Sequence, residues 1–267
     1  MLPKKRWALR PTLVGTTMQT PLPPEIFELV IDHLHDEPNT LKACCLVSKS
    51  WVPRSRIHLF AQVTFDPAGS PIESWVKAFP DPSNSPVYHT RRLRILDPGV
   101  VSAGACSWIR SFRHVRELAV RTSGWGELDG ISTVQLYGLS PTLKSLHLDN
   151  AGTSIPEILG LICSFPLLED LSLRSIFETD NHVWAAPPTS PKFTESLRLH
   201  GKNRLITRRL LELPDGLHFS MIQLRFHGGD ADSRKMTDLV SKCSGTLKCL
   251  CLCYHPMSTS PLVSTVD

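Results

Sequence analysis

The chain has 267 residues, 41% of them hydrophobic, and its 29 Lys and Arg against 25 Asp and Glu give a net charge of +4. This length allows a sizeable core in one or two domains, and so small a net charge gives no reason to expect a nucleic-acid partner. The eight cysteines form no CxxC pair, and no apolar run reaches the roughly 18 residues of a membrane span. We therefore expect an intracellular protein, cytoplasmic or nuclear, with reduced thiols and no membrane contact.

Residues 1–21 form a polar arm with a basic triplet, Lys4 to Arg6. So short a cluster is most often solvated, so we interpret the arm as flexible. The alternatives are an import signal or part of a targeting peptide.

Residues 22–60, which we call the helical module, are predicted to form three helices. Pro23 and Pro24 open the first helix, which runs to about Leu34, because the first turn needs no donor from proline. A second helix is capped by Asn39 or Thr40 and continues towards Trp51, and a short third helix follows Pro53. Three helices in so few residues make too small a core to be stable alone, so we expect a partner or the rest of the chain to cover part of this apolar surface.

The helical module also carries a recognisable pattern over its whole length. Its residues are Leu22-Pro23-x-Glu25-Ile26, then Ile31 and Leu34, then Leu41, then Cys45-Leu46-Val47-Ser48-Lys49-x-Trp51, and finally Leu59-Phe60. This pattern resembles the F-box, especially the version common in fungal proteins. The resemblance implies that the module binds a Skp-type adaptor and, through it, a cullin-RING ubiquitin ligase. The alternative is that these residues only form a core.

The resemblance and the apolar pattern together give a set of expected adaptor-binding residues. These are Leu22, Pro23, Glu25, Ile26, Leu29, Ile31, Leu34, Leu41, Leu46, Val47 and Trp51.

Residues 61–90 are expected to connect the module to the rest of the chain. Residues 62–65 have strand composition, residues 72–79 favour a short helix, and the Pro- and Ser-rich residues 80–86 form a loop. We place the domain boundary near this loop, although the strand and helix before it can pack on the second domain.

From residue 91 to residue 254 a short strand pattern recurs, with two apolar residues separated by one position. The copies lie 25 to 28 residues apart: Leu93-x-Ile95, Leu118-x-Val120, Leu146-x-Leu148, Leu171-x-Leu173, Leu197-x-Leu199, Leu224-x-Phe226 and Leu250-x-Leu252. Several copies extend to LxxLxL, which resembles the core of leucine-rich repeats. Helices are expected between strands, at residues 155–165 and 235–243 among others.

The predicted fold class is therefore α/β, with the helical module followed by a leucine-rich-repeat solenoid, its parallel strands on the concave side and its helices on the convex side. A repeat of this length cannot bury its own apolar face, so the end repeats need caps. The helical module can cap the first repeat. At the other end, only a polar tail, residues 255–267, comes after the last leucines.

The sequence offers no convincing catalytic residues, cofactor site or metal site. The glycines at 124, 126 and 130 do not fit a dinucleotide fingerprint, because the third comes one place late and no helix comes after it. Cys249, Cys251, Cys253 and His255 alternate along one strand at about 6.6 Å, so all four cannot converge on one tetrahedral zinc ion. We predict a protein that is not an enzyme and binds no cofactor.

Side chains beside the buried leucines point away from the core, because side chains alternate along a strand. Six of them are arginines, against three acidic residues, which suggests a wall that binds an acidic or phosphorylated protein segment. The alternative is that arginine is a common exposed residue and that these side chains have no binding role. The expected target-binding residues are Arg174, Arg198, Arg225, His200 and His227.

Together these features predict a substrate-recognition subunit of a cullin-RING ubiquitin ligase of the SCF type. The helical module would bind the adaptor, and the repeats would bind the target protein. The main alternative is a scaffold whose repeats bind a partner without a role in ubiquitin transfer.

Overall fold

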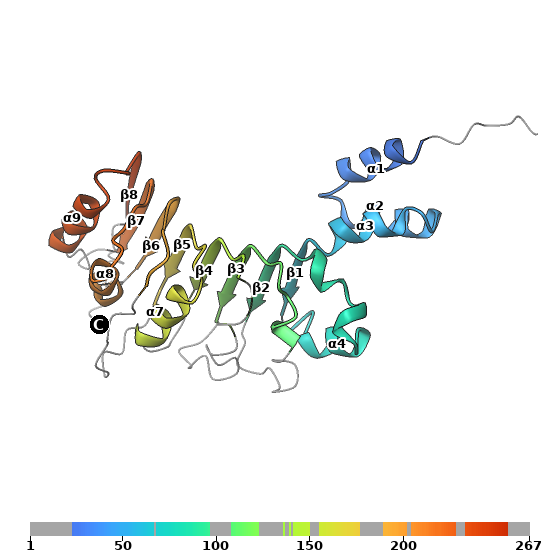
Figure 1. The fold of residues 1–267 in the computed structure, drawn as a ribbon, viewed down its shortest axis with the longest axis horizontal. Helices are drawn as coiled ribbons and strands as arrows, with labels where there is room; N and C mark the ends of the chain where they lie inside the picture. The colour runs from blue at the N-terminus through green and yellow to red at the C-terminus, as the bar shows by residue number, and fades with distance from the viewer. Residues whose placement is uncertain are drawn as a thin grey trace, which may run out of the picture.

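The structure is a computed structural model that describes residues 23–66, 68–96, 108–122, 136, 139, 141–149, 155–176, 189–201, 204–227 and 233–255. In these residues the fold is α/β, with one all-parallel sheet of eight strands (Figure 1). The strands are β1 (Gln62–Phe65), β2 (Arg92–Leu96), β3 (Glu117–Arg121), β4 (Ser145–Asp149), β5 (Asp170–Arg174), β6 (Ser196–His200), β7 (Met221–His227) and β8 (Cys249–His255).

Helices precede the sheet and connect its strands. The α-helices described are α1 (Pro24–His33), α2 (Pro38–Val47), α3 (Val52–Leu59), α4 (Ile72–Ala78), α7 (Ile155–Cys163), α8 (Arg204–Leu211) and α9 (Ser233–Lys242), and the 3-10 helices are η1 (Pro82–Asn84) and η2 (Pro86–His89). Three helices were expected near residues 72–79, 155–165 and 235–243. All three predictions are confirmed, with ends shifted by one or two residues.

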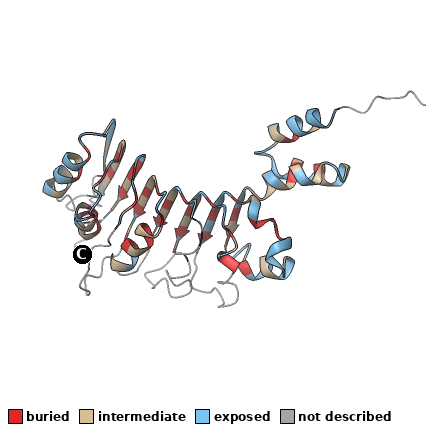
Figure 2. Ribbon diagram, viewed as in Figure 1, coloured by how far each residue is buried: buried red, intermediate tan, exposed pale blue. Residues whose placement is uncertain are grey.

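The strands lie side by side in sequence order, from β1 to β8. Their register aligns the two apolar residues of each strand, so that Leu146 faces Leu171 and Leu148 faces Leu173. From β1 to β7 both rows are buried in one continuous core that extends from Val63 to Cys243, and Figure 2 shows buried residues (red) alternating with less buried ones along these strands. A strand of two buried and three outward residues therefore repeats along the sheet.

The prediction for β7 was wrong by two residues. Ile222 pairs with Leu197 and Leu250, and Leu224 pairs with Leu199 and Leu252, so the buried pair is Ile222 and Leu224. Phe226 lies beyond this pair, next to Tyr254 in the register. The shift keeps every side chain on the same face, because residues two apart point the same way.

Residues 61–90 do more than connect the module to the sheet. β1 pairs in parallel with β2, so this segment supplies the first strand. Behind it, the ring of Trp75 in α4 packs against Phe65, with 5.9 Å between ring centroids, and against Phe112, also at 5.9 Å. This segment therefore closes the first end of the core with aromatic side chains.

The helical module extends past β1 and meets the sheet through α3 and η2 (Figure 1). α1 begins at a proline, as expected, and α3 is the predicted short third helix. The start of α2 differs from the expectation, since Pro38 is its first residue, and Thr40 bonds to the Glu37 carboxylate instead of capping. α2 ends at Val47, because Ser48 is already extended.

The sheet is open and is not curled like a solenoid. A solenoid bends because each repeat is rotated slightly against the one before. No helix in the described part of the chain is long and apolar enough to cross a membrane.

The register predicts that two neighbouring positions of β5 differ in their tolerance of a charged side chain. Leu173 is fully buried between Leu148 and Leu199, so Leu173→Asp should cost at least about 4 kcal/mol, from lost packing and from an unpaired buried carboxylate. Ser172→Asp is the matched control, because Ser172 lies on the other face between His147 and Arg198. Urea unfolding followed by circular dichroism compares the two variants, and equal midpoints would refute the register.

Candidate functional site

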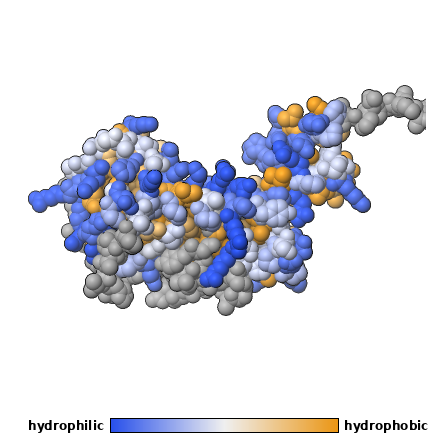
Figure 3. Space-filling model, in the orientation of Figure 1, coloured by the Kyte–Doolittle hydropathy of each residue, from blue (hydrophilic) through white to orange (hydrophobic). Residues whose placement is uncertain are grey.

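The helical module leaves many apolar side chains uncovered. Leu46 is 89% exposed and Val47 67%, at the end of α2. The other exposed apolar side chains of the module are Ile26, Leu29 and Val30 on α1 and Ile57 on α3. Figure 3 shows apolar atoms on the surface of this module. We call these six residues the apolar surface.

The structure divides the expected adaptor-binding residues into two groups. Ile31 and Leu41 are only 1% exposed, so they lie in the interior of the module. Cys44 is buried as well, and α3 is the helix that contacts both α1 and α2. Leu34 and Trp51 are half-buried, and the Trp51 ring packs on Phe27 at 5.3 Å between centroids.

The other expected residues in the described part of the chain are exposed. Pro23 and Glu25 lie at the exposed start of α1, next to Ile26 and Leu29. Leu46 and Val47 belong to the apolar surface as expected. Leu22 lies outside the described residues. Val30 and Ile57 are exposed as well, although neither was among the expected adaptor-binding residues.

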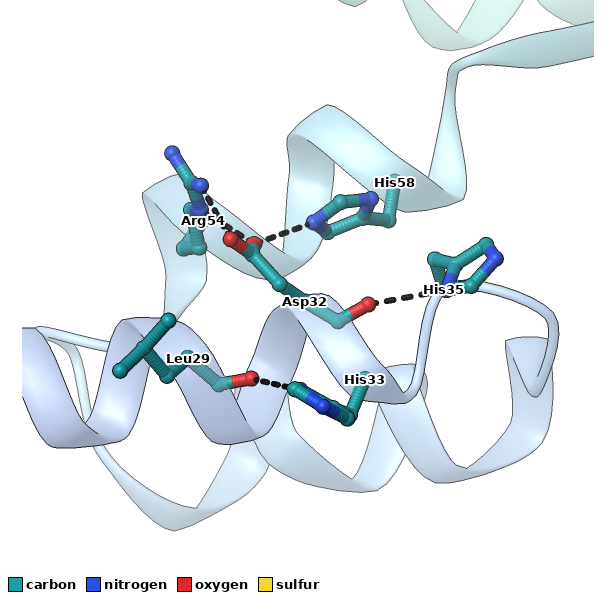
Figure 4. A network of polar contacts seen from close by, with 6 residues as sticks. All are labelled: Leu29, Asp32, His33, His35, Arg54 and His58. Carbon is teal, nitrogen blue, oxygen red and sulfur yellow. Dashed lines mark hydrogen bonds and ion pairs between the residues drawn. The ribbon is translucent and has the colours of Figure 1, made fainter.

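A polar network fixes α1 on α3 (Figure 4). The guanidinium of Arg54 donates through Nε to Asp32 Oδ1 at 2.6 Å and through a terminal nitrogen to Asp32 Oδ2. His58 Nε2 also donates to Asp32 Oδ1, at 2.7 Å. One carboxylate on α1 therefore binds two side chains of α3, and a two-point Arg–carboxylate contact fixes orientation as well as distance. His33 and His35 bond to backbone carbonyls of the same helix, at 2.8 and 2.9 Å.

This network makes Asp32 a stronger acid. The hydrogen bonds from Arg54 and then from His58 hold the pKa of Asp32 well below its ordinary value of 3.8. The carboxylate is thus charged throughout the neutral and mildly acidic range. Because the network orients α1 without using its apolar side chains, Ile26, Leu29 and Val30 stay available on the surface.

The second surface is the open face of the sheet, on the side away from the core. Its outermost row runs across the strands through Arg121, Asp149, Arg174, His200 and Arg225, which are neighbours in the register. Asp149 forms ion pairs with Arg121 and Arg174, each at 3.7 Å. This one carboxylate is shared by two arginines, so it cannot balance the charge of the row.

Three of the expected target-binding residues gather around a fourth. Arg174 and Arg225 flank His200 in the register, and Arg198 lies two residues from it on β6. Burial and then the charges of Arg225, Arg174 and Arg198 lower the pKa of His200 below its ordinary value of 6.5. A neutral imidazole with three guanidinium groups nearby indicates a positive local potential, which favours the binding of an anionic ligand. We call Arg174, Arg198 and Arg225 the arginine group.

Within the arginine group, Arg174 forms its ion pair with a carboxylate that it shares with Arg121, that of Asp149. Arg92 pairs with Glu117 at 3.2 Å, and Lys144 with Glu169 at 2.8 Å. In contrast, Arg225 Nε is buried and makes no hydrogen bond to any described residue. The side chain of His227, the fifth expected residue, lies outside the described part. The same holds for the glycines at 124, 126 and 130.

The described residues contain no group of three or more His, Cys, Asp or Glu side chains placed to hold a metal ion. No protein-family model matches the chain, and no curated protein matches it either. The roles of these two surfaces are therefore inferred from their own chemistry and from the resemblance of the helical module.

The network of Asp32 gives a pH-dependent prediction. Its folded-state pKa is depressed, so its contribution to stability is complete above about pH 4 and is lost as the pH falls towards the folded value. Asp32→Asn should lower the free energy of unfolding by about 1 kcal/mol at pH 7, a value discounted for partial exposure of the pair. The difference from wild type should shrink at pH 2.

Urea unfolding at the two pH values measures this difference. Asp36→Asn is the matched control, since Asp36 is a highly exposed carboxylate just beyond the same helix. A loss for Asp32→Asn no larger than for Asp36→Asn at pH 7 would mean that the network does not stabilise the module.

Proposed function

We propose that this protein is a non-catalytic substrate-recognition subunit of a cullin-RING ubiquitin ligase of the SCF type. The observation that carries the proposal is the apolar surface of the helical module, in particular Leu46 and Val47 at 89% and 67% exposed. Apolar side chains that stand this far into solvent and adjoin one another are characteristic of a protein-binding surface. The same residues resemble the F-box, which implies that the partner is a Skp-type adaptor.

The adaptor would contact the exposed members of the F-box pattern. On α1 these contacts would be Pro23, Glu25, Ile26 and Leu29. At the end of α2 they would be Leu46 and Val47. Ile31 and Leu41 support these helices from inside. Trp51 contributes through its ring contact with Phe27, which fixes the segment after α2.

For the sheet we propose a leucine-rich-repeat architecture. Its support is the parallel order of the strands, the alignment of the two apolar residues across neighbours and the 25 to 28 residues from one copy to the next. With Ile222 in place of Leu224 as the first apolar residue of β7, the last two intervals become 25 and 28. In this architecture the outward residues of the strands are the usual contacts for a partner.

The target protein would bind at the arginine group through an acidic or phosphorylated segment. Guanidinium groups form two-point hydrogen bonds with carboxylates and phosphates, which makes several of them together a suitable anion site. The arginine group lies on β5 to β7, and the helical module lies beyond β1 (Figure 1). Neighbouring strands are about 4.8 Å apart, so β1 and β6 are separated by about 24 Å. Adaptor and target therefore have room to bind together.

The alternative is a scaffold that binds partners without joining a ligase. Affinity purification of the tagged full-length protein from its own cells distinguishes the two functions. Recovery of a Skp-type adaptor together with a cullin supports the ligase, and their absence while other partners are recovered supports the scaffold.

A double substitution tests the adaptor surface. Leu46→Glu with Val47→Glu should weaken binding of a Skp-type adaptor at least tenfold, about 1.4 kcal/mol, since it places two charges where apolar contact is needed. The fold should be unaffected, because both side chains are exposed already. Leu167→Glu is the matched control, an exposed leucine in the sheet-forming part of the chain. Titration calorimetry measures the affinity, and equal affinity of the double variant and wild type would refute this surface.

A triple substitution tests the target surface. Replacing Arg174, Arg198 and Arg225 by Gln should lower binding of a phosphothreonine-containing peptide library at least tenfold and leave adaptor binding unchanged. The matched control replaces Arg92, Arg94 and Arg121 by Gln, which removes the same charge from β2 and β3 on the same face. If both triple variants lose binding equally, the anion preference comes from net charge and the arginine group has no special role.

A further inference from the structure

The last strand carries a row of thiols that the proposed function does not use. Cys249, Cys251 and Cys253 alternate along β8, so all three point to the open face of the sheet. All three are free cysteines, Cys249 exposed and the other two half-buried. The sulfur atoms of Cys251 and Cys253 are 3.8 Å apart, close enough to be in contact.

The backbone at this pair is compatible with a bond between the sulfurs. Alternate residues of a strand have Cα atoms about 6.6 Å apart, which is near the upper end of the disulfide range of about 4.4–6.8 Å. A modest contraction of the pleat brings them into the middle of that range. β8 pairs with β7 on one side, and its other side pairs with no described strand. An edge strand can contract more easily than a strand held on both sides.

The surroundings of this pair differ from those of Cys44, Cys163 and Cys243. Cys253 is the register partner of Arg225. The hydrogen bond with Cys253 raises the pKa of Cys251, and the nearby charge of Arg225 acts in the opposite direction. For the other thiols the main cause is burial, which raises the pKa of Cys163 to about 11 and also raises that of Cys243, and Cys44 is buried in the helical module. Thiols buried in apolar surroundings react slowly with oxidants.

We propose that Cys251 and Cys253 form an oxidation-sensitive dithiol, which a hydroperoxide converts to an intrachain disulfide. One thiolate attacks the peroxide, its sulfur becomes a sulfenic acid, and the O–O bond breaks to release an alcohol, or water when the oxidant is hydrogen peroxide. The neighbouring thiol then attacks this sulfur and expels the sulfenic oxygen as one molecule of water. In total the two thiols lose two electrons and two protons, and the peroxide gains them. The reaction itself requires neither adaptor nor target to be bound, although Cys253 neighbours Arg225 of the arginine group.

Mass spectrometry of the full-length protein tests the proposal. The reduced protein is treated with a few equivalents of hydrogen peroxide, blocked with N-ethylmaleimide and compared with untreated protein. Oxidation should remove two alkylation sites, both in the peptide that contains residues 249–253, and dithiothreitol should restore them. Cys163 and Cys243 should remain fully alkylated after denaturation.

Single variants assign the bond. Cys251→Ser and Cys253→Ser should each abolish the reversible loss, whereas Cys249→Ser should retain it, and all three should keep the wild-type circular dichroism spectrum. The proposal is overturned if the loss persists in Cys253→Ser, if Cys249→Ser abolishes it, or if the wild-type protein only gains oxygen at these cysteines without forming a disulfide.

Discussion

The fold depends on one constraint, the parallel register that aligns two apolar residues of every strand with those of its neighbours. Because side chains alternate, each aligned pair faces the core and leaves three residues on the open face. No single repeat can bury its own leucines, so each strand is stable only beside the next. The first strand, β1, is closed by the aromatic packing of α4. The last strand, β8, still exposes Leu250 and Leu252, at 43% and 62%.

The same register determines where function can reside. It places Arg174, His200 and Arg225 in one row and brings Arg198 beside them, so residues from three strands form one positively charged site. At the other end, the Asp32 network orients α1 on α3 with polar contacts and leaves apolar side chains outside. One end of the molecule thus offers a charged surface and the other an apolar surface, which suits two partners of different chemistry.

Sequence patterns predicted the strands well because paired leucines at a regular interval leave few alternatives. They failed at β7, where the apolar sequence pattern continues through Ile222, Leu224 and Phe226 and the register with β6 selects the first two. In the helical module, apolar residues surround α1 and α2, so periodicity could not tell that Ile31 and Leu41 face inward while Leu46 and Val47 face outward. Asp32 and Arg54 are 22 positions apart in the sequence. No local sequence pattern indicates that they are in contact.

The central claim is that an adaptor binds the helical module and leaves the sheet free for a target. Hydrogen–deuterium exchange of the full-length protein, alone and with a purified Skp-type adaptor, tests this claim most directly. The account predicts slower exchange in residues 24–33 and 38–47 on adding the adaptor, with no change in β5 to β7. Protection centred on the sheet, or no protection at adaptor concentrations that saturate a known F-box protein, would contradict it.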